Sequence, residues 1–533
     1  MTNPTKTTHY QHSPSVSFGE EIPGLPRVSE SPPAIKTAFR ERDSKERERD
    51  VTSSYYMGSP VVPAQHKART LILCFDGTGD HIVNFFSALS KGDPENQMVY
   101  YQAGIGTYIG RGANPLLTKI SKTLDEAVAW NLETHVMDGY EFLMQNYRAN
   151  DKICIFGFSR GAYTAKCLAG MLHKVGLLPA CNHQQVPFAY KMYKRPDEYG
   201  WKQSNAFKKA FSIDVDIEFL GVWDTVNSVG IIPRRLPFSA SNTLVRTFRH
   251  AIALDERRAK FKVNHWSRAT QEEALRSITD QRAARREKRE EARKAKQEKE
   301  KRDHKGHLHH YEARYSAIRH ETDVEEVWFA GCHCDVGGGS VTNVTKHSLA
   351  RIPLRWMIRE CFKTNSGIMF QVDELRSLGM DPEALYPIVL PRPPAATVEP
   401  ETHFIERSRK VQPDILDESE EMGSEADSFL EMTEEEHELY DALSPKYDQL
   451  AIKKSWWIGE ILPIRHKIQL SSSECIKTWG INKGKGRMLP ALDERGAKVH
   501  RSVRMRLGAT FEDGKKYVPK VVNFDEGKVT WVD

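Results

Sequence analysis

A serine with the surroundings of a nucleophile lies at Ser159. It is the centre of Gly157-Phe158-Ser159-Arg160-Gly161, a Gly-x-Ser-x-Gly motif that follows an apolar run and precedes a helical pattern. Between a strand and a helix such a serine sits on a strained turn, and the two glycines let strand and helix approach each other. The pattern predicts a nucleophilic serine with Gly157 and Gly161 as the elbow glycines. The backbone N–H of Arg160, at the helix N-terminus, is a candidate donor to an oxyanion.

A serine hydroxyl needs a base to remove its proton and a carboxylate to hold that base in the right tautomer. Asp224 and His333 each follow directly after an apolar run that predicts a buried strand. Because the carboxyl ends of parallel strands meet at one edge of a sheet, residues far apart in the chain can converge there. The chain order Ser, Asp, His is also that of doubly wound hydrolases. We therefore expect a catalytic triad of Ser159, Asp224 and His333.

Other residues compete for these roles. His250 fits the chain order but falls in a pattern that predicts a helix, and Asp335 could orient a base or only cap the glycine run that follows it. Gly77 and Thr78 occupy the place where such folds draw the second oxyanion donor from backbone N–H groups. The alternative for them is an Asp-Gly turn that only ends the strand.

Buried strands alternating with helices must position these residues. Apolar runs predict strands, and apolar spacing near 3.6 predicts helices, one of them broken near Gly139. The strands are expected at 71–75, 153–156, 217–223 and 327–332, and the helices at 117–147 and 162–175. Apolar strands separated by helices indicate a mostly parallel sheet covered on both faces. The expected fold is α/β, a doubly wound sheet of the α/β-hydrolase type.

Composition suggests the limits of the domains within the 533 residues. Residues 1–68 are rich in Pro, Ser and Thr and poor in large apolar groups, which predicts a disordered leader. The catalytic domain is expected at 69–390, interrupted at 271–315 by a charged insertion that is polar all round. A Pro-rich and acidic linker follows at 391–441. Residues 442–533 regain burial potential and should form a smaller C-terminal region that docks on the catalytic domain.

The net charge of +5 conceals opposed blocks. Residues 282–305 carry 12 Lys/Arg and 6 Asp/Glu, whereas residues 414–441 carry 13 Asp/Glu and no Lys/Arg. The near balance of the whole argues against a nucleic-acid-binding protein. In the basic block, interleaved glutamates and the lack of aromatic residues predict a solvated helix.

Several further classes of protein are excluded or disfavoured. No apolar run approaches the roughly 20 residues of a membrane-spanning helix, and the first residues lack the hydrophobic stretch of a secretory signal. Eight cysteines are too few for a disulfide scaffold. We therefore expect an intracellular, cytoplasmic protein.

Two features outside the triad also invite an interpretation. Cys332 and Cys334 lack the spaced second pair that a zinc site needs, so we expect no metal and no other cofactor. Trp456 and Trp457 stand beside Ile458 and other apolar residues, which indicates a core position, with a membrane interface as the alternative.

Five sequence blocks together resemble a known family. They are Phe75-Asp-Gly-Thr78, Gly157-Phe-Ser-Arg-Gly-Ala-Tyr-Thr164, Gly221-Val-Trp-Asp-Thr-Val226, Ala251-Ile-Ala-Leu-Asp-Glu-Arg-Arg258, and Trp328-Phe-Ala-Gly-Cys-His333 with Asp335-Val-Gly-Gly338. The family is that of the α/β-hydrolase phospholipase effectors of bacterial type VI secretion, which also has many uncharacterised fungal members. The resemblance covers roughly residues 69–390 and implies a lipase-like site for acyl esters of phospholipids. Its serine, aspartate and histidine fall on Ser159, Asp224 and His333.

The sequence thus predicts a serine ester hydrolase that forms an acyl-enzyme and acts on an acyl ester or phospholipid, with peripheral membrane contact. Ser159 would attack the acyl carbonyl, and water activated through His333 would release the acyl group. Two alternatives stay open. One is a carboxylesterase or thioesterase for soluble acyl compounds, and the other is a non-catalytic scaffold that retains the fold.

Overall fold

The computed structural model describes residues 60–63, 68–77, 81–104, 121–226, 236–266, 321–342, 345–398, 403–407, 432–469, 475–490 and 496–533. Gly58–Asp533 form one compact unit. The predictions for almost all of the leader, for the charged insertion at 271–315, for much of the acidic linker and for Thr78 lie outside the described residues.

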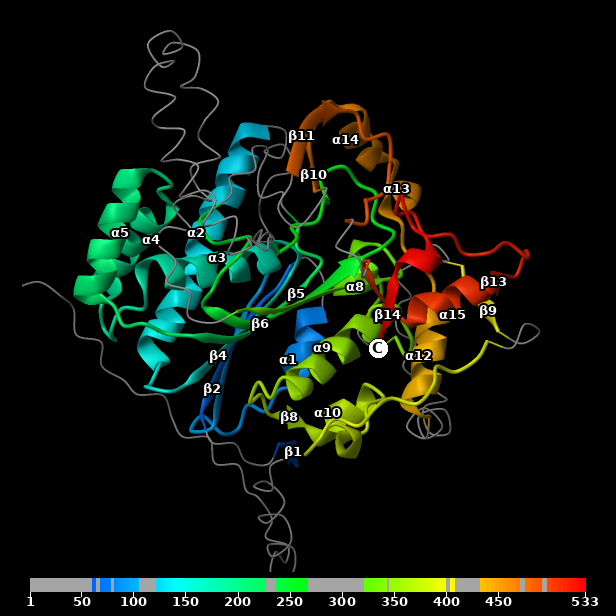
Figure 1. Ribbon diagram of the computed structural model, residues 1–533, viewed down its shortest axis with the longest axis horizontal. Coiled ribbons are helices and arrows are strands. Elements are labelled where there is room, and N and C mark those ends of the chain that lie inside the picture. The colour runs from blue at the N-terminus through cyan, green and yellow to red at the C-terminus, as the bar shows by residue number, and fades with distance from the viewer. Residues whose placement is uncertain are drawn as a thin grey trace, which may run out of the picture. The chain divides into compact units, whose positions relative to one another are not determined.

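An eight-stranded sheet forms the centre of the fold (Figure 1). Its strand order is β14-β12-β7-β6-β5-β4-β2-β3, and every neighbouring pair is parallel. The strands are β2 (Thr70–Phe75), β3 (Gln97–Gln102), β4 (Lys152–Phe158), β5 (Ile217–Trp223), β6 (Val245–Ala253), β7 (Asp323–Phe329), β12 (Lys498–His500) and β14 (Thr530–Val532). The predicted α/β class and mostly parallel sheet are confirmed.

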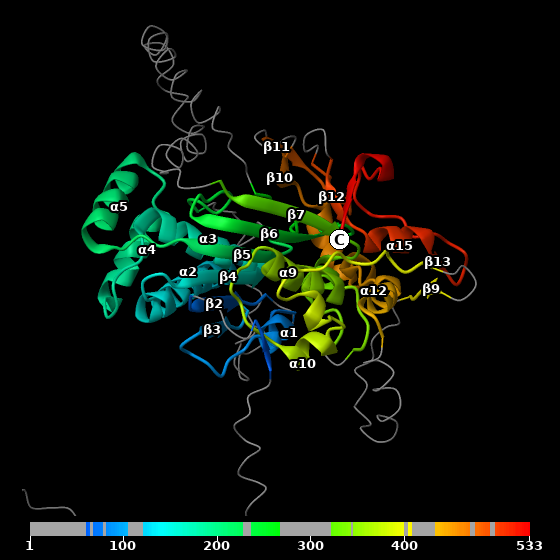
Figure 2. The same cartoon turned by 60° about the horizontal axis from the view of Figure 1, so that its bottom comes forward.

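Helices cover both faces of this sheet, which explains why β2, β4 and β5 are largely apolar. In β2, Ile72 and Cys74 pack into one core cluster, while Leu71 and Leu73 pack into the other. The first cluster is closed by α1 (His81–Ala88) and α9 (Arg351–Lys363), and the second by α2 (Ser121–Asn146), α3 (Ser159–Val175) and α4 (Val186–Lys194). Figures 1 and 2 show the two groups of helices on opposite sides, with α5 (Glu198–Phe211) beside α4.

Helix α2 is continuous, so the predicted break near Gly139 is wrong. Gly139 is needed there for close packing rather than for a bend. A Cβ atom at this position would lie 2.6 Å from Cζ of Phe75, on strand β2. The glycine therefore lets the helix lie directly against the ring.

The C-terminal region contributes to the main sheet. β12 pairs with β7 on one side and with β14 on the other, so this region extends the sheet beyond β7. Helix α12 (Glu434–Leu443) packs against α15 (Ser502–Gly508), and its Asp441 pairs with Arg355 of α9 at 2.7 Å. In Figure 1 this region is drawn in orange and red.

The smaller elements lie around this frame. The short helices are α8 (His333–Gly337), α10 (Val372–Ser377), α13 (Gln449–Ile452) and α14 (Trp457–Ile461), with 3-10 turns at His183–Gln185, Pro382–Ala384, Lys454–Trp456 and Glu526–Lys528. The two-stranded pairs are β1 (Val61–Val62) with β8 (Phe370–Gln371), β10 (Ile464–Gln469) with β11 (Cys475–Gly480), and β9 (Phe404–Ile405) with β13 (Thr510–Phe511). Among the described helices, none has both the length and the apolar composition to cross a bilayer.

The prediction that the tryptophan pair belongs to the core is wrong. Trp457 is 38% exposed, and its neighbours Ile458 and Ile461 are 64% and 63% exposed. Trp456 is half-buried. The apolar residues of α14 therefore face outward.

Candidate active site

Ser159 lies at the junction of β4 and α3, as its motif predicts. Its φ of 57° is in the left-handed region, and the side chain is buried. The glycines on either side are required by packing. A Cβ at Gly161 would lie 2.2 Å from the carbonyl oxygen of Phe75, and one at Gly157 would lie 2.5 Å from the carbonyl oxygen of Gly161. The turn is therefore the strained strand-to-helix elbow that the sequence predicts.

The other two predicted residues meet this serine. The Ser159 hydroxyl is 2.7 Å from Nε2 of His333, and Nδ1 of His333 is 2.5 Å from Oδ2 of Asp224. With Nδ1–H donating to the carboxylate, Nε2 accepts the hydroxyl proton. Asp224 directly follows β5, and His333 begins α8 just after β7. All three side chains are buried, so the hydrogen bonds are shielded from water.

Asp224 has a counter-ion that the sequence does not reveal. Arg487 pairs with both carboxylate oxygens, Nη1 with Oδ1 at 2.6 Å and Nη2 with Oδ2 at 2.9 Å. The Ala253 N–H also donates to Oδ1 at 2.8 Å. Burial opposes ionisation of Asp224, but the Arg487 charge and the hydrogen bonds from His333 and Arg487 outweigh it and lower the pKa of the carboxyl well below its usual range.

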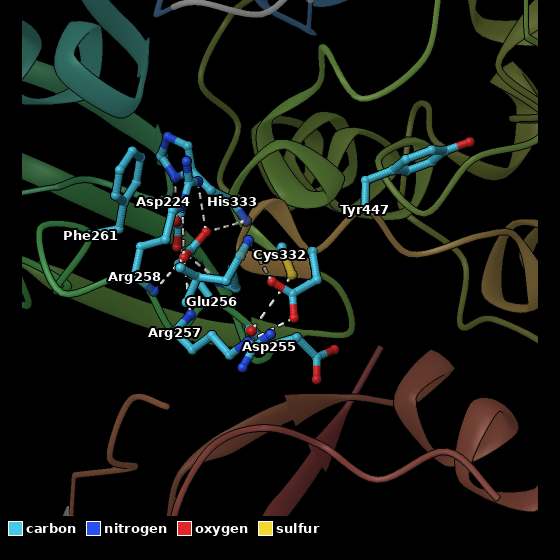
Figure 3. A network of polar contacts seen from close by, with 12 residues as sticks. Asp224, Asp255, Glu256, Arg257, Arg258, Phe261, Cys332, His333 and Tyr447 are labelled. Carbon is cyan, nitrogen blue, oxygen red and sulfur yellow. Dashed lines mark hydrogen bonds and ion pairs between the residues drawn. The ribbon is translucent and has the colours of Figure 1, made fainter. Parts of the chain in front are cut away.

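A second group of polar residues holds the loop that carries His333 (Figure 3). Glu256 accepts the His333 backbone N–H at 3.3 Å and pairs with Arg258 at 2.8 Å. Asp255 accepts the Gly331 N–H at 2.9 Å. Phe261 lies edge-on to the imidazole, with 4.8 Å between ring centroids. Asp255 and Glu256 belong to one of the five sequence blocks that resemble the family, but nothing in the sequence indicates this role for them.

The two competing residues lie elsewhere in the network. His250 belongs to β6 rather than to a helix, and its Nδ1 is 2.8 Å from Glu326. The helical interpretation is wrong because a strand buried on both faces shows no alternation that separates it from a buried helix. His250 accepts the Thr225 N–H at 3.2 Å, so it steadies the segment after Asp224.

Asp335 caps helix α8 rather than orienting the base. Its carboxylate accepts the N–H groups of Cys332 at 2.8 Å and of Tyr447 at 3.0 Å, and the Ser340 hydroxyl at 2.7 Å. Burial raises the pKa of Asp335 to about 6. The structure therefore supports a capping role for Asp335, but at the start of α8 rather than at the glycine run.

The predicted oxyanion donors differ in whether their backbone N–H groups are available. Arg160 lies in the first turn of α3, where N–H groups have no acceptor within the helix. Gly77 packs against Ser159, since a Cβ there would lie 2.9 Å from Cβ of Ser159. However, the Gly77 N–H donates to Oδ1 of Asp76 at 2.6 Å. Thr78 lies outside the described residues.

Within the described part of the chain, no group of three or more His, Cys, Asp or Glu side chains is arranged to hold a metal ion. Burial raises the pKa of the Cys334 thiol to about 12.

Comparisons with known proteins complete the description of the site. Residues 69–360, more than half of the chain, match the family described as T6SS, Phospholipase effector Tle1-like, catalytic domain. All three triad candidates lie inside this range, and Arg487 lies outside it.

The relatives share limited parts of their length. The chain is 38% identical over 229 residues to Uncharacterized protein YEL023C of Saccharomyces cerevisiae, and the match spans 38% of this chain and only 33% of the yeast protein. Among solved structures, an uncharacterized protein from Pseudomonas aeruginosa is 16% identical, with a TM-score of 0.31 over 60% of this chain and 50% of that one. A Tle1 effector bound to the VgrG spike of the type 6 secretion system is also 16% identical, with a TM-score of 0.23 over 54% of this chain and 58% of that one.

Proposed function

The chain belongs to the family of T6SS Tle1-like phospholipase effector catalytic domains, and from this premise we propose that it is a serine hydrolase that cleaves acyl ester bonds of phospholipids. The observation that carries the proposal is the continuous chain of hydrogen bonds from Asp224 through His333 to Ser159. A scaffold without catalysis would have no need to keep a strained serine and a buried ionised carboxylate on either side of one imidazole.

The reaction would proceed in two steps. Ser159 Oγ attacks the acyl carbonyl while His333 Nε2 takes its proton, and the imidazolium then gives that proton to the departing alcohol. Water attacks the acyl-enzyme in the same way, releasing the fatty acid and restoring the serine. Asp224 stays ionised and stabilises the imidazolium in both steps. The Arg160 N–H is the first oxyanion donor, and the Thr78 N–H is the better second candidate because that of Gly77 is engaged.

Arg487 is a positioning residue in this scheme. It holds both oxygens of Asp224 and thereby fixes the carboxylate that orients His333. A buried carboxylate without such a partner would tend to protonate, and a neutral acid cannot stabilise the imidazolium.

The decisive test is Ser159→Ala, assayed on a short chromogenic ester and on a glycerophospholipid. We expect turnover to fall by about 1,000-fold or more on both, as for loss of a triad nucleophile. Ser204→Ala, which removes an equally buried hydroxyl from α5, is the matched control and should retain activity. Unchanged turnover in Ser159→Ala would disprove the assignment.

Two further measurements separate the alternatives. A fluorophosphonate probe should label the wild-type chain and not Ser159→Ala, whereas a non-catalytic scaffold should take up no label. Hydrolysis of phospholipid vesicles is then compared with hydrolysis of soluble esters. A clear preference for the vesicles supports a phospholipase, and a preference for soluble esters identifies a carboxylesterase or thioesterase.

A further inference from the structure

A patch of apolar side chains lies exposed on α13, α14 and the segment after β11. It is formed by Ile452 (48% exposed), Trp457 (38%), Ile458 (64%), Ile461 (63%), Leu462 (52%) and Ile481 (49%). We call these six residues the α14 ledge. Single exposed apolar residues are common on proteins, but several of them together mark a surface that meets an apolar partner.

Helix α14 buries a polar side chain and exposes apolar ones, which is the reverse of an ordinary surface helix. Its buried residue is Glu460, which is 2% exposed. The Glu460 carboxylate accepts the Ala259 N–H at 2.6 Å, the Asn482 side-chain amide at 2.6 Å and the Gly484 N–H at 3.0 Å. These bonds fix the polar side chain inward, so the apolar side chains of the same short helix are held outward. The exposure of the ledge is thus built into the fold.

Basic residues surround the ledge. Residues 446–490 carry nine Lys/Arg and three Asp/Glu, and of these bases Lys446 and Arg487 are paired with Asp255 and Asp224. Of the acids in this range, Asp448 is paired with Arg257 and Glu460 is buried. Four lysines are exposed on the elements that form the ledge, namely Lys453, Lys454, Lys483 and Lys485. In the described part of the chain, no carboxylate forms an ion pair with any of the four.

The ledge lies close to the catalytic histidine. Trp456, which precedes α14, packs edge-on against Phe261 with 5.6 Å between centroids, and Phe261 packs edge-on against His333 at 4.8 Å. Two aromatic contacts therefore connect Trp456, the neighbour of the ledge residue Trp457, with His333. A surface bound by the ledge would lie beside the place where an acyl ester must reach Ser159.

We propose that the α14 ledge docks the protein on an anionic phospholipid surface. Apolar side chains that insert among lipids, with lysines around them for the head groups, are what such a surface binds. A second copy of the chain is the less suitable occupant, because two basic surfaces would repel each other. The inference rests on the proposed function, since it assigns the ledge to the surface that holds the substrate.

Vesicle sedimentation with the full chain tests the inference. Binding is measured in the Ser159→Ala background, so that the lipid is not consumed, on phosphatidylcholine vesicles with and without about 30% phosphatidylserine. The double variant Ile458→Glu/Ile461→Glu should weaken binding to the anionic vesicles by about tenfold or more. Lys453→Glu/Lys454→Glu should weaken it and reduce its dependence on salt. Ile388→Glu, at an exposed apolar residue (74%) outside the ledge, is the matched control and should bind like its parent.

Activity provides the second measurement, this time with Ser159 intact. The ratio of vesicle hydrolysis to soluble-ester hydrolysis should fall by about tenfold in the Ile458/Ile461 variant and stay constant in Ile388→Glu. The inference is overturned if the Ile458/Ile461 variant binds vesicles as well as its parent, or if the parent does not bind anionic vesicles. A dimer that this variant converts to a monomer, with vesicle binding unchanged, would assign the ledge to a second copy. Failure of the triad assignment would show in Ser159→Ala turnover and leave vesicle binding intact, so the two failures are distinct.

Discussion

Ser159 and Asp224 both have backbone conformations that side-chain-bearing residues rarely adopt, with φ of 57° and 40°. Each such conformation costs about 1 kcal/mol or more and persists only where the surrounding structure enforces it. Ser159 directly follows β4, and Asp224 directly follows β5. Backbone strain is therefore present at the two residues that hold His333 from opposite sides.

The triad candidates could be predicted because each stands at the end of an apolar strand, and strand ends of a parallel sheet share an edge. Arg487 could not be predicted in this way. It lies between lysine-rich and apolar residues without a motif, and its contact with Asp224 spans 263 positions. Glu256 and Asp255 were visible as residues of a block, but their role depends on contacts that only the fold creates.

Among single-residue changes, Arg487→Met should lower kcat by about 10- to 100-fold, because Asp224 loses the partner that keeps it ionised and aligned. Without the Arg487 charge the pKa of Asp224 should rise, so the acid limb of the kcat/KM profile should move to higher pH. The pH–rate profile of the soluble ester measures both effects. Arg487→Lys, which keeps the charge, should recover part of the activity and shift the limb less.

The control for this variant is Arg407→Met, which breaks an exposed ion pair with Asp513, a residue outside the triad, and should leave the profile in place. If Arg487→Met lost activity with no shift of the acid limb and Arg487→Lys gave no recovery, the arginine would be only a structural residue.

Among the elements, β2, β4 and β5 were predictable because they are apolar runs, and β7 was recognised by its apolar end. The central strand β6 has a pattern that predicts a helix, β3 was not predicted, and β12 and β14 have only three residues each and carry no periodicity. Helix α2 was predicted with a break because glycine is a poor helix former. A glycine is needed at position 139 because the helix packs against Phe75 of β2, and this contact cannot be read from the local sequence.

Gly139→Ala should therefore destabilise the protein, although alanine is the better helix residue. The added methyl group would overlap the Phe75 ring, at a cost of about 1–3 kcal/mol in the free energy of unfolding. Gly508→Ala provides the contrast, because a Cβ at that end of α15 meets nothing within 4 Å. Thermal unfolding should show a lower Tm for the first variant and an unchanged or higher Tm for the second. Equal Tm values would contradict the packing explanation.

Asp335 gives helix α8 a pH dependence of stability. Its pKa rises from the ordinary 3.8 to about 6, so the folded state favours the protonated acid. The resulting stabilisation is complete below pH 3.8 and is lost as the pH rises to about 6, a change of at most about 3 kcal/mol. Asp335→Asn does not titrate, and its amide can still accept from Cys332 and Tyr447.

Denaturant unfolding at several pH values compares the two proteins. Relative to Asp335→Asn, the wild type should lose about 1–3 kcal/mol of unfolding free energy between pH 4 and pH 7. Asp381→Asn, which alters an exposed cap, should follow the wild-type curve. Parallel curves for wild type and Asp335→Asn would show that this carboxyl ionises normally.

For the molecule as a whole, the site is completed by residues beyond the family match at 69–360. The C-terminal region supplies Arg487 to Asp224, Tyr517 to Asp255, and strand β12 to the edge of β7. Composition indicated that this region would fold, but its sharing of one sheet with the strands that precede the triad candidates could not be foreseen.

A chain that lacks residues 442–533 should therefore show no measurable hydrolysis, although it retains Ser159, Asp224 and His333. It leaves Asp224 without its counter-ion, a loss typically worth about 3–5 kcal/mol for a buried pair, and uncovers the edge of β7. Removal of residues 1–57, which precede the compact unit, should preserve activity. Soluble-ester turnover of the two purified chains makes the comparison, and an active chain without residues 442–533 would contradict it.

The long contact between Asp224 and Arg487 also sets an order of events during synthesis. With 263 residues between the two partners, a ribosome needs on the order of tens of seconds to make the second after the first. During that interval the nascent chain already holds the serine, the aspartate and, later, the histidine, but not the arginine that keeps the aspartate charged. A growing chain therefore holds the three triad candidates before it holds the counter-ion of Asp224. Under the proposed function, full ester hydrolysis should be gained only after the C-terminal region has been made.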